Sequence, residues 1–355
     1  MIAGRRQSVS GKTKEEVKRK RRELLANADK GLLPSSKQSL AEYMTWWLAD
    51  VVKPSKPAST YRIYEQLTRL YIVPVLGNVK LAKLEPAYVQ KLHAEMQAKG
   101  LSRNTVQRAH RVLHNALNRA VEWGYIPRNV ATVVHPPTPE KGDMRVLDVR
   151  QSERLFEAAR GTRWEALITL AIATSLRESE LLGLKWADLD LERGKLTVQR
   201  KLSSLTRQLE DPKTPGTRRS MRLPTYATRA LLAHRASQNE ARLIKGGDYQ
   251  DNGLVFATYD GKPLIARNVT REFKKLLERA GLPDVRFYDL RHTAATLMLL
   301  QGIPARVVQE RLGHSQISLT LGTYSHVLPS MDDDAAARMD ALFGGMVQRH
   351  TEAGS

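Results

Sequence analysis

A polar, proline-rich segment at residues 135–142, HPPTPEKG, interrupts the helical pattern of this chain. Its prolines restrict φ and lack backbone N–H donors, so the segment is expected to be an extended linker. The chain has 355 residues, more than one hydrophobic core usually organises. We therefore expect two or three folded domains, with a boundary at this linker.

The sequence before the linker has the apolar periodicity of helices, punctuated by proline and glycine. Helices are predicted at residues 39–52, 58–76, 85–99 and 102–123. The last helix has arginines on its other faces and one apolar stripe, formed by Val106, Ala109, Val112, Leu113, Ala116, Leu117 and Ala120. His110 and His114 lie one turn apart, as in zinc-binding helices. Arg111 stands where such helices carry Glu, however, so two ordinary helix histidines are expected.

The sequence after the linker mixes both periodicities. Helices are predicted at residues 152–159 and around 164–172, then strands at 195–202 and 219–223, and helices again from residue 226 onward. The fold class expected for the whole chain is mostly α with a small antiparallel β-sheet.

Charge points to the class of partner. The chain has 57 Lys and Arg against 37 Asp and Glu, a net charge of +20, which favours a polyanion and nucleic acid first. A soluble protein with a merely basic surface is the other interpretation. The chain has no cysteine, which excludes disulfides, thiol nucleophiles and Cys-type zinc sites.

The lengths of the apolar stretches indicate whether the chain could enter a membrane. The run at residues 166–176 has 11 residues, too few to cross a bilayer, and the N-terminus has no signal-like apolar core. A soluble, cytoplasmic protein without a membrane partner is expected, associated with the nucleoid in a bacterial host.

Two stretches of the second half contain candidate anion-binding residues. In residues 174–184, TSLRESELLGL, Ser175 and Glu178 fit a capping box, which would put Arg177 in the first turn of a helix. The helix dipole disfavours a cation there, so Arg177 is a candidate for binding an anion, or else an exposed surface arginine. Residues 212–219, PKTPGTRR, read as a hairpin tip that carries Lys213.

Two further stretches contain titratable residues close together. Residues 288–293, YDLRHT, open an apolar helix and include Tyr288 and Arg291. Residues 312–315, LGHS, contain His314, and Tyr324 follows ten residues later.

The order, spacing and neighbours of these four stretches resemble the tyrosine recombinase, or phage integrase, family. The resemblance implies a helical core-DNA-binding domain followed by a mixed α+β catalytic domain. The basic N-terminus resembles the end of an arm-site DNA-binding domain that lacks its early strands. The expected division is a basic arm at 1–38, a core-binding domain at 39–135, a linker at 136–144, a catalytic domain at 145–330 and a tail or helix at 331–355.

The resemblance also implies a role for each candidate residue. It makes Arg177 and Arg291 the arginines that bind the scissile phosphate, and Lys213 the proton donor to the leaving 5′ oxygen. It makes His314 a hydrogen-bond donor to the phosphate and Tyr324 the nucleophile, in a reaction that needs neither a cofactor nor a metal.

Two residues depart from the family pattern. Most family members have His where this chain has Tyr288; a phenol can donate a hydrogen bond but accepts a proton poorly near neutrality. Ser175 stands where the family usually has glycine, a change that a capping serine would tolerate.

The implied activity is site-specific integration or excision of a phage genome or mobile element through a 3′-phosphotyrosyl intermediate. Implied partners are double-stranded attachment sites, three further protomers in a homotetramer, and accessory DNA-bending or directionality proteins. The apolar stripe of the tail would dock on a neighbouring protomer or on its own domain. A topoisomerase of the same chemistry and a DNA-binding accessory factor with impaired catalysis are the alternatives.

Overall fold

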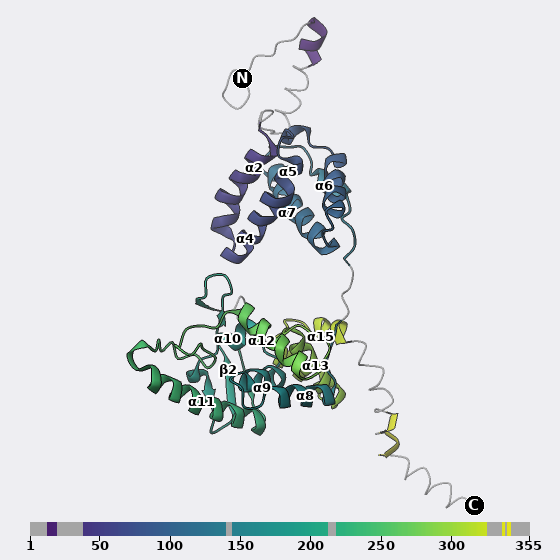
Figure 1. Cartoon of the computed structure of the whole chain (residues 1–355). Helices are drawn as coiled ribbons and strands as arrows, with labels where there is room; N and C mark the ends of the chain where they lie inside the picture. Colours follow the sequence, from purple (N-terminus) through teal and green to yellow (C-terminus); the bar gives the residue numbers. More distant parts are fainter. Residues whose placement is uncertain are drawn as a thin grey trace, which may run out of the picture. The chain divides into compact units, whose positions relative to one another are not determined.

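The computed structural model describes residues 13–19, 38–139, 144–211, 218–324, 336–337 and 339–341. They belong to two compact units, residues 1–142 and 143–355, each with its own hydrophobic core (Figure 1). Of residues 1–37, the structure describes only 13–19, of which 14–19 are helical. Most of the tail lies outside the described residues, and none of the described helices is long and apolar enough to span a membrane.

The first unit consists of helices that follow one another closely along the chain. Its elements are α2 (Leu40–Trp46), η1 (Trp47–Val52), α3 (Lys53–Ser55), α4 (Ala58–Leu67), η2 (Thr68–Ile72), α5 (Val73–Leu76), η3 (Leu81–Lys83), α6 (Pro86–Ala98), α7 (Arg103–Glu122) and η4 (Val130–Val133). The two helices predicted first both form, and each widens to a π-helix, at η1 and η2. Each wide stretch comes just before a proline, Pro54 or Pro74, whose ring and missing N–H disfavour a regular α-turn.

The predicted apolar stripe of α7 is confirmed as the centre of this core. All seven of its members are buried. The backbone N–H of Thr105 donates to the Ser102 hydroxyl at 3.3 Å, which caps the start of the helix. The Tyr43 hydroxyl of α2 donates to the Ala116 carbonyl at 2.7 Å, so α2 is held against the middle of α7.

Two buried histidines meet between α6 and α7. Nε2 of His93 lies 3.1 Å from Nδ1 of His110, and the two residues are 1% and 9% exposed. Burial lowers the pKa of His93, and burial together with the neighbouring histidines lowers the pKa of His110 to about 4. Both imidazoles are therefore neutral near pH 7, and His110 is a core residue of the unit.

We expect stability to fall as the pH is lowered from about 7 to about 5. The unfolded chain binds a proton at His110 below the ordinary pKa of 6.5, whereas the folded chain does so only near 4. His110 alone then accounts for a loss of about 2 kcal/mol at the lower pH. Urea unfolding of the wild type and His110→Gln, followed by circular dichroism at both pH values, measures this. The variant should lose that part of the pH dependence; an unchanged difference would contradict the assignment.

The second unit is helical with two small sheets. Its elements are α8 (Val149–Ala159), α9 (Glu165–Thr174), α10 (Glu178–Leu182), η5 (Trp186–Asp188), β1 (Leu189–Asp190), β2 (Lys195–Val198), β3 (Lys201–Leu202), β4 (Leu209–Glu210), β5 (Arg219–Arg222), α11 (Thr225–Lys245), η7 (Gly246–Asp248), α12 (Ala266–Arg279), α13 (Asp289–Leu300), α14 (Ala305–Leu312) and α15 (Ile317–Tyr324). The fold class predicted from the sequence is confirmed.

Two details of the second unit differ from the prediction. The strand predicted at residues 195–202 is divided, because β2 pairs antiparallel with β1 and β5 whereas β3 pairs with β4. The helical prediction from residue 226 onward is wrong for residues 249–265, which contain isolated bridges and no helix. Gly261 in this segment has φ +80°, and a Cβ there would lie 2.2 Å from the Gln250 carbonyl oxygen, so a helix cannot continue through it.

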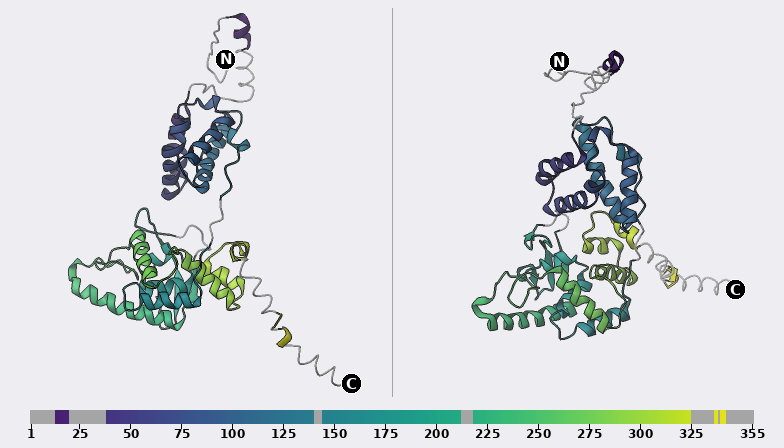
Figure 2. Two further views of the ribbon diagram at one scale, coloured as in Figure 1. Left: turned by 45° about the vertical axis from the view of Figure 1, so that its right-hand side comes forward. Right: turned by 45° about the horizontal axis from the view of Figure 1, so that its top comes forward.

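The core of the second unit is centred on α9, which is buried along nearly its whole length and packs against α8, α11 and α13. A smaller apolar cluster joins α13, α14 and α15 through Ala295, Leu299, Val308, Leu312 and Tyr324. In both views of Figure 2, the helices of residues 289–324 gather at one side of the unit, with α11 at the other. Lys213 lies outside the described residues. The other predicted site residues stand between α9 and α10, at the start of α13, after α14 and at the end of α15.

Candidate active site

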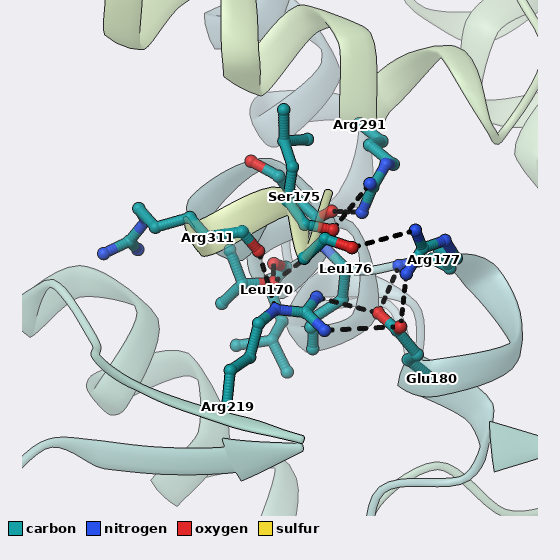
Figure 3. A network of polar contacts seen from close by, with 11 residues as sticks. Leu170, Ser175, Leu176, Arg177, Glu180, Arg219, Arg291 and Arg311 are labelled. Carbon is teal, nitrogen blue, oxygen red and sulfur yellow. Dashed lines mark hydrogen bonds and ion pairs between the residues drawn. The ribbon is translucent and has the colours of Figure 1, made fainter. Parts of the chain in front are cut away.

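Arg177 and Arg291, distant in sequence, are brought together by the turn between α9 and α10. Figure 3 shows their guanidinium groups at this turn, with Glu180 below Arg177 and Arg219 reaching in from β5. Three guanidinium groups therefore lie close together at this turn, where positive charge is concentrated.

The turn itself corrects the predicted capping box. Ser175 ends α9 in the left-handed conformation, with φ 58°, and does not begin α10. Arg177 is the N-cap residue of α10, and its backbone N–H donates to Oε2 of Glu180 at 3.0 Å. The left-handed region favours glycine, which accounts for the glycine that the family usually has here. The Ser175 hydroxyl is buried and has no hydrogen-bond partner among the described residues.

Arg291 is the buried arginine of the pair, at 2% exposure. Its Nη1 donates to the Ser175 carbonyl at 2.7 Å and its Nη2 to the Leu312 carbonyl at 2.6 Å. Burial, and then the charge of Arg177, lower the pKa of Arg291 to about 10. The guanidinium is therefore still charged near pH 7, and two carbonyls fix its orientation.

Glu180 offsets part of this positive charge. It is 4% exposed and accepts from Nη1 of Arg177 at 2.8 Å and from Nη2 of Arg219 at 2.9 Å. Burial alone would raise the pKa of Glu180, but the hydrogen bonds and charges of Arg219 and Arg177 outweigh it and hold the pKa below its usual value. Arg219 also donates from Nε to the Arg311 carbonyl at 2.8 Å, which ties β5 to α14.

His314 follows α14 and lies near both arginines. Its Nδ1 is 2.9 Å from the Thr320 hydroxyl of α15. Burial, followed by the charges of Arg291 and Arg177, lowers the pKa of His314 to about 4. Gly313 makes the preceding turn with φ +64°, and a Cβ there would approach the Arg219 guanidinium to 3.0 Å. The neutral imidazole can donate one hydrogen bond to an anion held by the arginines.

Tyr324 is the last residue of α15 and is only 1% exposed. Its ring packs in the apolar cluster of α13, α14 and α15, and its Oη lies 2.9 Å from Nδ1 of His292. Burial raises the pKa of the phenol above its usual value, against the opposing charge of Arg291. In this structure the phenol is therefore a protonated, sheltered group.

Tyr288 has a different environment from Tyr324. It immediately precedes α13, is 44% exposed, and lines a pocket with Arg177. Its ring meets that of His292 edge to face, with centroids 5.2 Å apart. This exposure leaves the residue accessible to a ligand in the pocket, which argues against Tyr288 serving only to fill space. Lys213 lies outside the described residues.

The sequence prediction missed three residues of this site: Glu180, Arg219 and His292. The first two form an ion pair across 39 positions, and the third contacts Tyr324 across 32. Glu180 lies three residues after Arg177 and His292 directly follows Arg291, so both lie in stretches that the sequence analysis singled out for those arginines. No local sequence pattern predicts that Arg219 pairs with Glu180.

The combined groups suit chemistry on a phosphate. Arg177 and Arg291 each bear a positive charge that disfavours the other, and a bound anion would relieve this repulsion through fixed, charge-assisted hydrogen bonds. A neutral imidazole and a tyrosine hydroxyl lie in the same part of the unit. These are the components of an enzyme that transfers a phosphoryl group to an oxygen nucleophile.

Comparison with known proteins identifies the family. The phage integrase family model matches residues 145–331, and the model of the phage integrase N-terminal SAM-like domain matches residues 39–97. A XerC-like tyrosine recombinase of Caldanaerobacter subterraneus is 34% identical over 95% of this chain and 92% of its own, and an integrase of Streptomyces ambofaciens is 30% identical over 94% and 88%. The chain belongs to the phage integrase family and is a tyrosine-type site-specific DNA recombinase.

Solved structures have the same fold. The integrase of the transposon Tn1549, in complex with transposon right end DNA, matches 86% of this chain and 99% of its own with a TM-score of 0.72 and 21% identity. A lambda integrase dimer bound to a core site matches 81% and 95%, with a TM-score of 0.59 and 18% identity.

We predict that Glu180→Gln lowers the free energy of unfolding by about 3 kcal/mol, because it removes the buried carboxylate that is paired with Arg219 at 2.9 Å and with Arg177 at 2.8 Å. Glu178→Gln is the matched control. Burial raises the pKa of Glu178 to about 7, so an uncharged amide replaces a carboxyl that is already partly protonated, and a change below ~1 kcal/mol is expected. Urea unfolding at neutral pH compares the two. Equal losses would show that the Glu180 charge is not what holds the site together.

Proposed function

We propose that Tyr324 attacks the scissile phosphate and that Arg177 and Arg291 bind its non-bridging oxygens. His314 donates a further hydrogen bond, and Lys213 protonates the leaving 5′ oxygen. The observation that carries this proposal is the pair of neighbouring guanidiniums, which face no anion other than Glu180 among the described residues and lie next to a neutral imidazole. Lys213 is assigned by resemblance alone.

The proposed roles follow from how charge moves during cleavage. As the tyrosine oxygen attacks, negative charge grows on the non-bridging oxygens, and two preoriented guanidiniums stabilise it more than they stabilise the starting phosphodiester. Arg291 can do this without reorganising, because the Ser175 and Leu312 carbonyls already orient it. The 3′-phosphotyrosyl bond conserves the energy of the broken linkage, so a 5′ hydroxyl can reverse the reaction without ATP.

Tyr288 is proposed as a further hydrogen-bond donor to the phosphate. The residue is exposed and lines the pocket that Arg177 also lines. A phenol donates a hydrogen bond as an imidazole does, so the substitution of tyrosine for the usual histidine is compatible with an active enzyme.

The DNA duplex is proposed to contact the helical unit as well as the site. Arg103, Arg108 and Arg111 are exposed on α7, on faces other than its buried stripe. We propose residues 39–135 as the core-DNA-binding domain, residues 1–38 as a basic arm, 136–144 as a linker and 145–330 as the catalytic domain. Phosphate contacts of this kind make binding strongly dependent on salt.

The active assembly is proposed to be four protomers on two attachment sites, acting on nucleoid DNA with accessory bending or directionality proteins. The tail at residues 331–355 would dock on a neighbouring protomer. Mass measurement of the complex assembled on paired sites should give four protomers; a stable, active complex of two would contradict the proposal.

Tyr324→Phe should bind DNA with nearly unchanged affinity and form no covalent adduct, because one oxygen is lost and the ring is kept. Host DNA that carries the integration locus is incubated with each protein, and adducts are captured after denaturation and sequenced. Adducts of the wild type should map to one position on each strand of an attachment site. Adducts of the variant at the wild-type level would move the nucleophile elsewhere, with Tyr288 as the next candidate.

Tyr288→Phe should slow single-turnover cleavage by roughly 10- to 100-fold, the cost of one transition-state hydrogen bond, whereas Tyr288→His should retain activity. The assay uses a nicked duplex built on the mapped cleavage position, at saturating protein. A Phe variant as fast as the wild type would remove Tyr288 from the site.

A further inference from the structure

The Tyr324 hydroxyl has one close neighbour that can take its proton. Its Oη is 2.9 Å from Nδ1 of His292, a contact that joins α15 to α13. Among the residues that the structure describes, His292 is the titratable side chain with a hydrogen bond to this oxygen. We propose that His292 is the general base that removes the proton of Tyr324 during strand cleavage. The inference rests on the proposed role of Tyr324 as the nucleophile.

The position of His292 suits this role. Tyr288 and His292 lie four residues apart, one helical turn, and the His292 ring is in contact with both tyrosines, at centroid distances of 5.2 Å and 5.8 Å. The imidazole therefore stands between an exposed phenol that can reach the phosphate and a buried phenol that must be deprotonated. The proposed proton acceptor, His292, therefore lies one helical turn after Tyr288.

His292 is also in the protonation state that a base requires. Burial lowers its pKa; Asp289 opposes this, and Arg291 and Arg286 add to it. The groups that face it are these three, Tyr288 from the preceding turn, Tyr324 from α15 and His314 after α14. The imidazole is thus neutral near pH 7, and the tautomer with the proton on Nε2 leaves the Nδ1 lone pair for the tyrosine proton.

Other titratable groups nearby are engaged elsewhere. Glu180 is held by Arg177 and Arg219. His314 is bonded through Nδ1 to Thr320, and the positive charges around it suit a donor better than a base. Because of these contacts, neither Glu180 nor His314 is a candidate for the general base.

The step balances as follows. The Oη–H bond of Tyr324 breaks and the proton passes to Nδ1 of His292, while the oxygen lone pair forms the new bond to phosphorus. The bond from phosphorus to the 5′ oxygen breaks, and that oxygen takes a proton from Lys213 or from solvent. Because proton transfer accompanies bond formation, no free phenolate has to form in the buried cluster. The Asp289 carboxylate stabilises the resulting imidazolium, and resealing returns the proton to Tyr324.

His292→Asn separates a base from a merely positioning residue. The Asn side-chain oxygen lies close to where Nδ1 was, so it can accept the hydrogen bond, but it cannot take the proton. On the nicked duplex described above, we expect cleavage on the order of 100-fold or more slower at unchanged DNA affinity. His292→Ala should be equally slow, and free imidazole should restore its rate in proportion to concentration. Cleavage by His292→Asn within threefold of wild type would overturn the proposal.

The two variants test the proposal separately, since imidazole rescue of His292→Ala decides it should the Asn variant fail to fold. No rescue by imidazole in a folded Ala variant that still binds DNA would also overturn it. If the proposed function is wrong, Tyr324→Phe will still form the covalent adduct. If only the role of His292 is wrong, Tyr324→Phe will be inactive and His292→Asn will be active.

A modified substrate distinguishes loss of a base from loss of an acid. In a duplex with sulfur in place of the 5′ bridging oxygen, the leaving group departs as a thiolate, with a pKa near that of a thiol, ~8.5, and needs no proton. We expect this substrate to restore cleavage by Lys213→Ala but not by His292→Asn. Restoration of the His292→Asn rate would assign His292 to the leaving group and overturn its role as the base.

Discussion

The Glu180 carboxylate is the charge on which the geometry of the site depends. Arg177, Arg219 and Arg291 converge in a region that burial largely shields from water, and like charges there repel strongly. Glu180 accepts from the first two, and the Ser175 and Leu312 carbonyls hold the third. Arg291 is thus oriented by two carbonyls that carry no net charge, and its positive charge favours a phosphate.

Burial also keeps the proposed nucleophile, Tyr324, unreactive. The Tyr324 ring lies among Leu299, Val308 and Leu312, where a phenolate would be poorly solvated and the pKa of the phenol is raised. In the proposed mechanism, attack by this tyrosine becomes favourable only when a phosphate can accept the developing charge. The reaction would then depend on a phosphate bound to the arginine pair.

Two histidines of the site are neutral for related reasons but suit opposite proposed roles. His314 is surrounded by Arg177 and Arg291 and is suited to donate to an anion. His292 is next to Asp289 and in contact with Tyr324, and is suited to accept a proton. The difference arises from the neighbours that packing supplies, since the two side chains are chemically identical.

The sequence by itself determined whatever depends on neighbours along the chain. The buried stripe of α7 and the fold class follow from local spacing and composition, and the order of the stretches around Arg177 and Arg291 is what resembles the family. Tertiary structure alone decided that Ser175 is left-handed, that Glu180 pairs with Arg219, and that His292 meets Tyr324. Periodicity specifies which face of a helix is buried, but the side chains that meet across that face depend on how α9, α13 and α15 pack, which no local pattern encodes.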